Sequence, residues 1–375
     1  MEKIKLLHII NTLQLGGVER IVTTICNALD KNIYNVTLLV LSNNKKDLYS
    51  VIDSDVNVIE LDCFHHGNSL KDSVSLFFKF RSLKKIINQI NPDVINTHVF
   101  FYNVIPVLLA VKLYVPKVKH FHTIHTGGLH YAFDHIVFKH RVENYFYKQL
   151  STTLISISEE VKKLISNKYP TVNNVLIENF FDEKLFNSSL KQRNQVAGDE
   201  IQLIYVARFD KGKNHKTLIS AMRAVVHKHP KVKLNLVGDG ILMEDMQNLT
   251  KQFCLSENII FHGYQKDVIK FIATSDVVVF PSEFEGFSIS LIECLAVGLP
   301  AVCSDIPTFR SLIQEEQDVL YFDVFNAAQL TEKILYVIEN KEVYSNMSVA
   351  STRIADNYSQ KKIISKYNDL YNCNQ

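Results

Sequence analysis

Short apolar runs alternate with helix-length amphipathic segments from one end of the chain to the other. This alternation is typical of parallel β-sheets, because each pair of parallel neighbours needs a crossover of a dozen or more residues. Strands are predicted at 5–10, 36–41, 56–61, 94–97, 118–123, 153–157 and 175–177, and again at 202–207, 233–237, 259–261, 277–280, 301–303 and 319–322. The pattern predicts an α/β fold of two doubly wound, Rossmann-like domains, with ligand-binding loops at the carboxyl ends of their strands.

The length of 375 residues also favours two domains, since single domains usually run about 100 to 200 residues. A polar stretch at 186–200 is rich in Asn, Ser and Gln, lacks a clear period, and is interpreted as the interdomain linker. We expect one domain at 1–188 and the other at 189–358. The segment 359–375 has helical spacing and could close the chain against either domain, including by packing back on the first.

Composition and charge argue against several classes of protein. The 41 basic and 39 acidic side chains leave a formal charge of only +2, which argues against a dedicated nucleic-acid binder. The six cysteines show no C-x-x-C spacing, which fits a reducing cytosol. The longest uncharged apolar run, 104–111, is far shorter than the roughly 20 residues of a membrane span. We therefore expect a cytoplasmic protein that at most contacts a membrane surface.

One segment could make such a contact. Residues 70–90 carry basic side chains among apolar ones, an amphipathic pattern that could rest on anionic lipid. The alternative is an ordinary domain helix with a solvated basic side. The basic residues are Lys71, Lys79, Arg81, Lys84 and Lys85.

Glycine is scarce, with 12 in 375 residues against a usual share of about 7%, so each one marks a place where the backbone matters. Gly16 and Gly17 follow the first strand and open a helix, where free amides favour an anion; a tight turn is the alternative. Gly238 and Gly240 form a G-x-G turn after a strand. A dinucleotide site would want a third glycine at 243, where Met243 stands, so that interpretation is weak.

Two cations follow the strand at 202–207. Arg208 comes directly after it and Lys213 at the entry to the next helix, which suits a clamp for a diphosphate. A solvated basic loop is the alternative.

Two carboxylates follow the strand at 277–280. Glu285 ends the turn and Glu293 lies eight residues on in the helix, about 12 Å away along the backbone. A glycosidase pair lies closer, roughly 5 to 9.5 Å apart. The separation suits the two ends of an extended ligand, such as a ribose and a hexose flanking a diphosphate, whose middle would meet the amides of Gly286, Phe287, Ser288 and Ile289. A surface helix with two solvated glutamates is the alternative.

These landmarks, in this order over nearly the whole chain, resemble the retaining GT-B glycosyltransferases of family 4. The resemblance is carried by Glu285 and Glu293 with seven residues between them, the preceding Pro281-Ser282, the following 296–300, the Arg208 to Lys213 spacing, the Gly238 turn, Gly263 and the Gly16-Gly17 loop. It implies transfer of a hexose-type sugar from a nucleotide-sugar, UDP-linked by preference, to a glycan or lipid-linked acceptor. The second domain would hold the donor and the first the acceptor. No metal and no cofactor are expected.

The resemblance also implies roles for single residues. Arg208 and Lys213 would neutralise the diphosphate leaving group, Glu285 would contact the donor sugar, and Glu293 would bind the ribose. Gly263, Tyr264 and Gln265 would meet the base, and Gly16 and Gly17 would complete the phosphate site. His125, at the end of a strand, would lie beside the donor sugar. His98 and His122 fit core histidines better, although His98 also follows a strand and could face the acceptor.

The chain departs from the family pattern after Asp305, where 306–311 replaces a Gly-rich turn and its glutamate, and a glycine usual near 317–318 is absent. This departure keeps open the alternative of a non-catalytic nucleotide-sugar-binding subunit. A nucleotide-sugar epimerase of the same fold is a second alternative.

Overall fold

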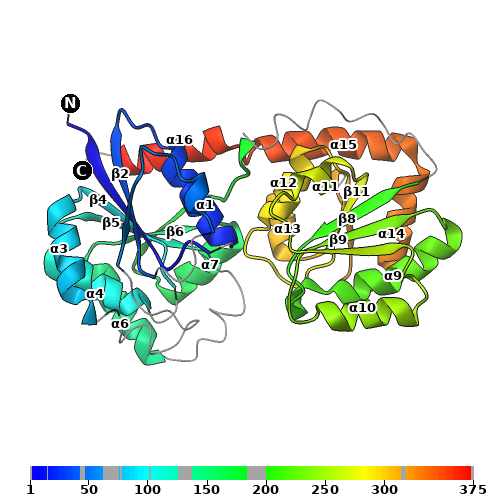
Figure 1. Cartoon of the computed structure of the whole chain (residues 1–375), viewed down its shortest axis with the longest axis horizontal. Helices are drawn as coiled ribbons and strands as arrows, with labels where there is room; N and C mark the ends of the chain where they lie inside the picture. Colours follow the sequence, from blue (N-terminus) through cyan, green and yellow to red (C-terminus); the bar gives the residue numbers. More distant parts are fainter. Residues whose placement is uncertain are drawn as a thin grey trace. The chain divides into compact units, whose positions relative to one another are not determined.

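The computed structural model describes residues 2–14, 16–42, 47–61, 76, 78–100, 103–125, 137–183, 200–313 and 318–372, with the side chains of 137 and 138 left aside. The chain divides into two compact units, one of Met1–Asn179 with Lys361–Gln375 and one of Phe180–Gln360 (Figure 1). Each unit contains one parallel sheet, so the predicted α/β fold class is confirmed. The predicted linker lies outside the described residues apart from Glu200.

The first unit has a seven-stranded sheet in the order β3-β2-β1-β4-β5-β6-β7. Its strands are β1 (Ile4–Ile10), β2 (Tyr34–Val40), β3 (Asn57–Glu60), β4 (Val94–Thr97), β5 (Lys119–Ile124), β6 (Thr153–Ser156) and β7 (Asn173–Leu176). Its helices are α1 (Gly17–Ala28), α3 (Phe80–Ile90), α4 (Val104–Tyr114), α6 (Val137–Gln149), α7 (Glu159–Lys168) and α16 (Gln360–Asn372), with a 3-10 turn η1 (Tyr49–Val51). The central strands β1, β4 and β5 are buried along most of their length, as their apolar runs require.

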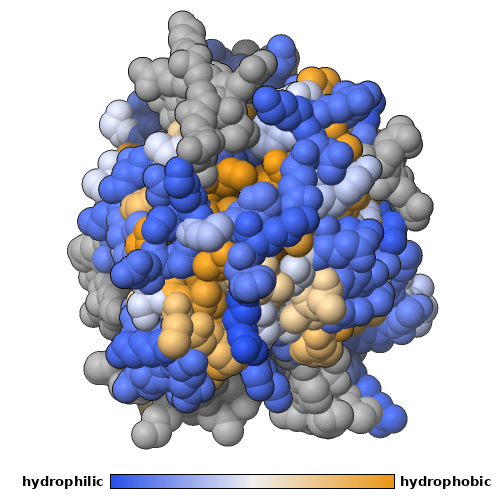
Figure 2. Space-filling view, turned by 90° about the vertical axis from the view of Figure 1, so that its right-hand side faces the viewer, coloured by the Kyte–Doolittle hydropathy of each residue, from blue (hydrophilic) through white to orange (hydrophobic). Residues whose placement is uncertain are grey.

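The second unit has a six-stranded sheet in the order β10-β9-β8-β11-β12-β13. Its strands are β8 (Gln202–Val206), β9 (Lys233–Val237), β10 (Ile259–Gly263), β11 (Val277–Phe280), β12 (Ala301–Ser304) and β13 (Leu320–Phe322). Its helices are α9 (His215–Lys228), α10 (Met243–Gln252), α11 (Ile269–Ala273), α12 (Ile289–Ala296), α13 (Pro307–Leu312), α14 (Ala327–Glu339) and α15 (Lys341–Asp356), with a 3-10 turn η4 (Lys211–Lys213). Hydrophilic residues cover most of the face shown in Figure 2, with apolar residues between them.

Both sheets reverse their strand order at one point, between β1 and β4 in the first and between β8 and β11 in the second. Such a reversal opens a crevice at the carboxyl ends of the two strands, because their crossover helices leave toward opposite faces. The predicted strands are all present, with ends shifted by up to two residues. The two reversals are therefore where functional side chains are to be sought.

The last helix, α16, belongs to the first unit. The buried Tyr371 lies against the rings of Tyr34 and Phe121, and its hydroxyl accepts a hydrogen bond of 2.7 Å from Asn96 Nδ2. Lys119 Nζ donates to the carbonyl oxygen of Leu370 at 2.9 Å, near the end of the helix where the negative pole of its dipole lies. The C-terminal helix is thus held by the sheet of the first unit.

We predict that Tyr371→Ala lowers the free energy of unfolding by about 3 to 5 kcal/mol, because it removes a large buried ring and leaves a cavity. Tyr371→Phe keeps the ring and loses only the bond from Asn96, so it should cost about 1 kcal/mol. Urea unfolding of both variants measures the difference. Equal effects of the two substitutions would show that packing of this ring does not hold α16.

Candidate functional site

The loops that follow β8 and β11 meet at the reversal of the second sheet. Asn214 Nδ2 donates to the carbonyl oxygen of Pro281 at 3.1 Å, and the amide of Glu283 donates to the carbonyl oxygen of Gly212 at 2.9 Å. A Cβ atom on Gly212 would lie 2.3 Å from Cζ of Phe284, so no side chain fits there unless that ring moves. The two loops therefore form one joined surface.

An ion pair lies at this junction. Lys213 Nζ is 2.7 Å from Glu285 Oε1, and the two side chains are only 24% and 9% exposed. Ser282 Oγ donates to the same carboxylate oxygen at 2.8 Å, and Thr308 Oγ1 donates to the backbone oxygen of Glu285 at 2.8 Å. Two residues that the sequence assigned to one ligand are thus brought together, and Glu285 is fixed at both its side chain and its backbone.

Tyr205 holds two residues of this ion-pair junction in place, Lys213 and Ser282. Its hydroxyl donates to the carbonyl oxygen of Lys213 at 2.9 Å and lies 3.0 Å from Ser282 Oγ. Burial, with the carboxylate of Glu285 nearby, raises the pKa of Tyr205 well above its usual value, so it stays a neutral donor. Ser282, Thr308 and Tyr205 were not assigned to the site from the sequence. The sequence offered Ser282 only as part of the Pro281-Ser282 landmark, and it gave no signal for Thr308 or Tyr205.

The second cation, Arg208, has a different environment. Its side chain is 80% exposed and pairs with Asp210 Oδ2 at 2.7 Å. An exposed pair of this kind contributes at most about 1 kcal/mol, so an anionic ligand can displace it cheaply. Arg208 and Lys213 are thus each paired with a carboxylate of the protein, one loosely and one firmly.

Glycines after β9 and at the end of β10 bring together the loops that follow β8, β9 and β10. Gly238 has φ of +144°, and a Cβ there would lie 2.0 Å from the carbonyl oxygen of Ala207. A Cβ on Gly240 would lie 2.7 Å from the backbone nitrogen of Phe209. The amide of Gly238 donates to the carbonyl oxygen of Gly263 at 2.9 Å. Gly238 and Gly240 are therefore needed because the backbone of Ala207 and Phe209 lies directly against them. This packing accounts for the G-x-G turn without a bound dinucleotide.

The predicted base-binding loop follows β10. Gly263 has a left-handed φ of +65°, Tyr264 is about half exposed, and Gln265 Nε2 donates to the carbonyl oxygen of His262 at 2.7 Å. The loop is thus held by its own side chain while one aromatic ring stays accessible.

The residues of the loop before α12 differ in their exposure and in their contacts. Gly286 lies between Glu285 and the buried Phe287, whose ring packs on Tyr358, so Phe287 could offer a ligand only its backbone. Ser288 occupies the N-cap position without a capping hydrogen bond from its side chain, and its φ of +55° is a left-handed and strained value for serine. Ile289 begins α12. Glu293 is buried in α12, which does not fit the alternative of a solvated surface helix.

The space beside Gly16 in the Gly16-Gly17 turn of the first unit is filled by the side chain of Glu19. Gly16 precedes α1, and a Cβ on it would lie 2.2 Å from Glu19 Oε2. Thr12 Oγ1 donates to the other oxygen of Glu19 at 3.2 Å, and burial raises the pKa of this carboxyl group. An anion at this helix terminus would therefore meet a carboxylate, a feature that the glycine pattern did not reveal.

Histidines gather at the reversal of the first sheet. His98 follows β4 and His125 follows β5, and Nδ1 of His98 lies 2.9 Å from Nε2 of His125. Nε2 of His98 lies 2.8 Å from Nδ1 of His8 in β1. His122 instead bonds Thr97 Oγ1 through Nδ1 at 2.7 Å, as a core histidine should. Burial lowers the pKa of His8 and of His125 to about 3, so both are neutral at pH 7.

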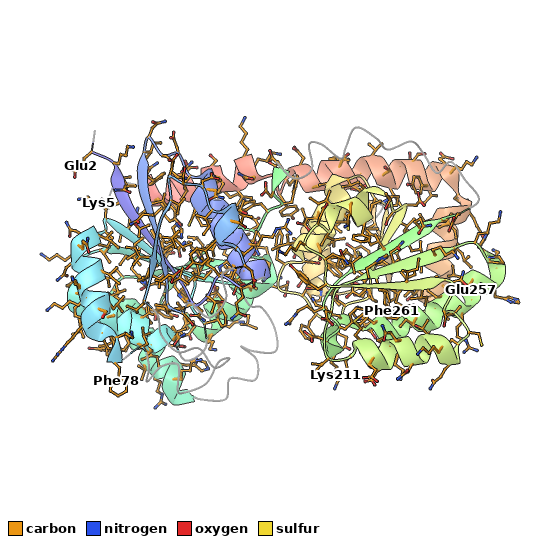
Figure 3. The ribbon with its side chains drawn as sticks, in the orientation of Figure 1. Glu2, Lys5, Phe78, Lys211, Glu257 and Phe261 are labelled. Atoms are coloured by element: carbon orange, nitrogen blue, oxygen red, sulfur yellow. The ribbon has the colours of Figure 1, made fainter. Side chains whose placement is uncertain are left out.

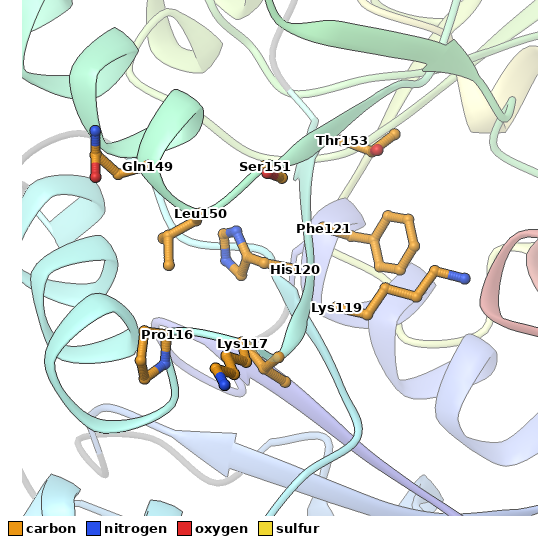
Figure 4. A pocket seen from close by; sticks show the side chains of 10 residues that line it. Pro116, Lys117, Lys119, His120, Phe121, Gln149, Leu150, Ser151 and Thr153 are labelled. Carbon is orange, nitrogen blue, oxygen red and sulfur yellow. The ribbon is translucent and has the colours of Figure 1, made fainter. Parts of the chain in front are cut away.

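A pocket of about 290 Å³ lies elsewhere, at the amino ends of β5 and β6 (Figure 4). Pro116, Lys117, Gln149 and Leu150 are among its lining residues. None of the residues predicted for the donor site or for catalysis lines it. It is therefore distinct from the constellations at the carboxyl ends of the strands.

We predict that removing the side chain of Lys213 lowers the stability of the fold more than removing that of Arg208. Lys213→Ala should lower the free energy of unfolding by about 1 to 3 kcal/mol, because the mostly buried carboxylate of Glu285 loses a charge-assisted partner. Arg208→Ala should change it by less than about 0.5 kcal/mol, because that side chain is exposed. Urea unfolding tests both, and adding Glu285→Gln to Lys213→Ala should recover part of the loss. A larger cost for Arg208→Ala would contradict this view of the ion pair.

Comparisons with known proteins agree with this geometry. The model of "Glycosyltransferase Family 4" matches residues 15–185, and that of "Glycosyl transferases group 1" matches residues 187–353, so together they span most of the chain. HepE of Anabaena, solved in complex with UDP and glucose, superposes with a TM-score of 0.79 at 15% identity, covering 99% of this chain and 100% of that one.

Two curated relatives have named activities. The UDP-Gal:alpha-D-GlcNAc-diphosphoundecaprenol alpha-1,3-galactosyltransferase of Escherichia coli is 24% identical over 98% of this chain and 97% of its own length. The N-acetylgalactosamine-N,N'-diacetylbacillosaminyl-diphospho-undecaprenol 4-alpha-N-acetylgalactosaminyltransferase of Campylobacter jejuni is 26% identical over 92% of this chain and 94% of its own length.

Proposed function

We propose that this chain, which belongs to glycosyltransferase family 4 and has the GT-B fold, moves a hexose-type sugar from a UDP-sugar to a lipid-linked saccharide. Membership makes it a retaining, nucleotide-sugar-dependent glycosyltransferase. The observation that carries the finer proposal is the junction of the β8 and β11 loops, where Lys213 and Glu285 are held together at the reversal of the sheet. The names of the two relatives, one with a UDP-sugar donor and both with diphospho-undecaprenol acceptors, supply the substrate class.

In this proposal the second unit binds the donor. Lys213 has three N–H donors and uses one on Glu285, so the others can face the diphosphate as negative charge develops on it. Arg208, loosely paired and exposed, adds a second positive charge to the leaving group. Glu285 accepts hydrogen bonds from donor-sugar hydroxyls, and the buried Glu293 accepts them from the ribose.

The first unit, in the same proposal, binds the acceptor at the carboxyl ends of β1, β4 and β5. His125 lies at this edge and would stand beside the donor sugar during transfer. The carboxylate of Glu19 at the turn of α1 would have to move aside, or accept a proton, for Gly16 and Gly17 to bind a phosphate.

We predict that the protein transfers sugar from a UDP-sugar to a saccharide on undecaprenyl diphosphate, and that Glu285→Gln lowers kcat/KM by about 10² to 10³, because the anionic acceptor of sugar hydroxyls is lost. The assay combines UDP-linked hexoses and N-acetylhexosamines with short lipid-linked saccharides, and product linkage is read by NMR. Glu257→Gln is the matched control, since Glu257 lies exposed before β10, at the amino end of the same sheet (Figure 3).

Other results would redirect the proposal. Full activity in Glu285→Gln would remove this residue from the site. An epimerised nucleotide-sugar formed without any acceptor would replace transfer with the epimerase alternative. Binding of GDP or ADP in place of UDP, measured by calorimetry, would overturn the donor base.

Within this proposal we also place the first unit on an anionic membrane, where a lipid-linked acceptor resides. Among the described residues, no helix has the length and apolarity needed to cross a bilayer. Phe78, 84% exposed and directed outward in Figure 3, lies beside the basic α3. The neighbouring helices α4 and α6 expose Leu113 and Tyr145 by 60% and 57%. Exposed apolar side chains next to basic ones are suited to the interface of an anionic bilayer. Residues 70–75 and 77 of the predicted amphipathic segment lie outside the described residues.

We predict that the protein sediments with phosphatidylglycerol vesicles and not with phosphatidylcholine vesicles, and that binding weakens with salt. Phe78→Ser/Arg81→Glu/Lys85→Glu should reduce binding at least tenfold, since charge contributes about 1 kcal/mol per basic residue near the surface. The control Val349→Ser/Lys216→Glu/Lys251→Glu makes the same change in charge and one apolar-to-serine change in the second unit, on exposed side chains. Equal losses in both variants would show that total charge, and no particular surface, drives binding.

A further inference from the structure

The turn between β13 and α14 holds a phenylalanine in a left-handed backbone conformation. Phe325 has φ of +71°, and the amide of Asn326 donates to the carbonyl oxygen of Asp323 at 2.9 Å, so Phe325 is the third residue of a hydrogen-bonded turn. A positive φ at that position normally requires Gly or Asn. Among the described residues, the others apart from glycine that have a positive φ are Asn91, Ser151, Asn214, Cys254 and Ser288. Phe325 is thus the one large side chain in this set.

Packing within the fold does not account for this conformation. A bulky residue at positive φ costs free energy, because its Cβ atom crowds the backbone. Phe325 is also 64% exposed, so its ring adds little to the core and leaves apolar surface in water. Asparagine would suit the turn better on both counts. The two unfavourable features together indicate that the ring contacts something outside the fold.

Phe325 lies at the same edge of the second sheet as the ion pair of Lys213 and Glu285. It follows β13, whereas the pair follows β8 and β11, and the strands β11, β12 and β13 are neighbours in parallel pairing. Neighbouring strands lie a little under 5 Å apart, so the carboxyl ends of β11 and β13 are separated by about 10 Å. Two linked pyranose rings span such a distance.

The edge between these two strand ends carries groups that bind hydroxyls. Asp305 and Arg310 pair through bonds of 2.8 and 2.9 Å, and their side chains are 40% and 36% exposed. Thr308 in the same segment bonds the backbone oxygen of Glu285. The amide of Asp305 donates to the carbonyl oxygen of Phe322, the last residue of β13, at 2.8 Å. The protein surface is therefore continuous from the ion pair to the end of β13.

An exposed aromatic ring beyond such polar groups suits a saccharide. A pyranose has hydroxyls around its rim, which hydrogen-bond to charged side chains, and C–H groups on its faces, which pack on the electron-rich face of an aromatic ring. A purely apolar ligand would leave Asp305 and Arg310 without a use. A nucleotide is already provided for at the loops after β8 and β10, on the other side of the ion pair.

We propose that Phe325 stacks on the second sugar of a lipid-linked acceptor, counted from the sugar that reacts. The proposal rests on the proposed function, which puts the donor sugar beside Glu285. The reacting sugar must meet the donor sugar there, whatever holds the rest of the acceptor. Since the nucleotide occupies the side of β8 and β10, the next sugar of the acceptor lies toward β13. The substrate class is then a saccharide of at least two sugars on its lipid.

Transfer kinetics with two acceptors tests this contact. Both carry the same reacting sugar, one directly on undecaprenyl diphosphate and one with a second sugar in between. We expect the KM of the disaccharide acceptor to be about five- to tenfold lower, the effect of one aromatic contact. Phe325→Asn should make the two KM values equal while kcat and the KM of the UDP-sugar stay unchanged. Phe325→Tyr keeps the ring and should keep the preference.

Stability measurements separate this role from folding. Phe325→Asn should raise the midpoint of thermal unfolding by about 2 to 4 °C, because asparagine tolerates a left-handed backbone. Cys254→Asn is a matched control, since it changes another exposed residue of positive φ, after α10. Tyr336→Asn is a second control that removes a half-exposed ring from α14. Neither control should change the KM of either acceptor.

Several outcomes would overturn the proposal. Equal KM values for the two acceptors in the unchanged protein would do so, as would a preference that survives in Phe325→Asn. A dimer that Phe325→Asn converts to monomers in sedimentation equilibrium would assign the ring to a contact between copies of the chain.

Failure of the proposed function would be seen separately, as absence of transfer with every donor and acceptor. Calorimetric titration with the same disaccharide freed of its lipid would then decide the contact. Binding that is lost in Phe325→Asn and kept in Tyr336→Asn would support it, and absence of binding to the unchanged protein would refute it.

Discussion

The ion pair between Lys213 and Glu285 joins the two strands at which the second sheet reverses. A mostly buried carboxylate needs charge or hydrogen bonds around it, and Glu285 has Lys213 and Ser282 at one oxygen. Those partners are in turn placed by the hydroxyl of Tyr205 and by the contact of Gly212 with Phe284. The protein's own contacts therefore hold this junction in place, with Lys213 bonded to the mostly buried Glu285 and Arg208 paired with Asp210 at the exposed side.

The first sheet uses the same topology with different chemistry. At its reversal there is no described counterpart of the lysine–glutamate pair, and neutral imidazoles take its place. Neutral rings direct hydrogen bonds without carrying charge. The reversal of the second sheet is thus held by an ion pair, and that of the first by bonds between uncharged rings.

Much of this architecture could be predicted from the sequence, because parallel strands in a covered sheet must be apolar throughout and their loops must emerge at one edge. Lys213 and Glu285 could be found for that reason, since both follow strands. The supporting hydroxyls could not be found in this way, because that of Tyr205, which bonds Ser282 and the backbone of Lys213, lies inside a strand and has no pattern of its own. The position of Glu19 could not be predicted either, because its carboxylate folds back toward Gly16, where the glycine pattern indicated room for an anion. The contact between His8 and His98 could not be predicted either. A single polar residue in an apolar strand indicates only that it has some hydrogen-bond partner, and here that partner lies 90 residues away.

The segment after Asp305 departs from the family pattern and still contacts the junction of the β8 and β11 loops. Where a Gly-rich turn with a glutamate was expected, Pro307 begins the short helix α13. Thr308 then holds the backbone of Glu285, so the segment supports the remaining carboxylate in place of supplying another. Arg310 pairs with Asp305 at 2.8 Å and lies over the ring of Tyr321, so its charge is directed to the edge of the sheet. Glu285 is thereby held by three separate residues, two at its side chain, Lys213 and Ser282, and one at its backbone, Thr308.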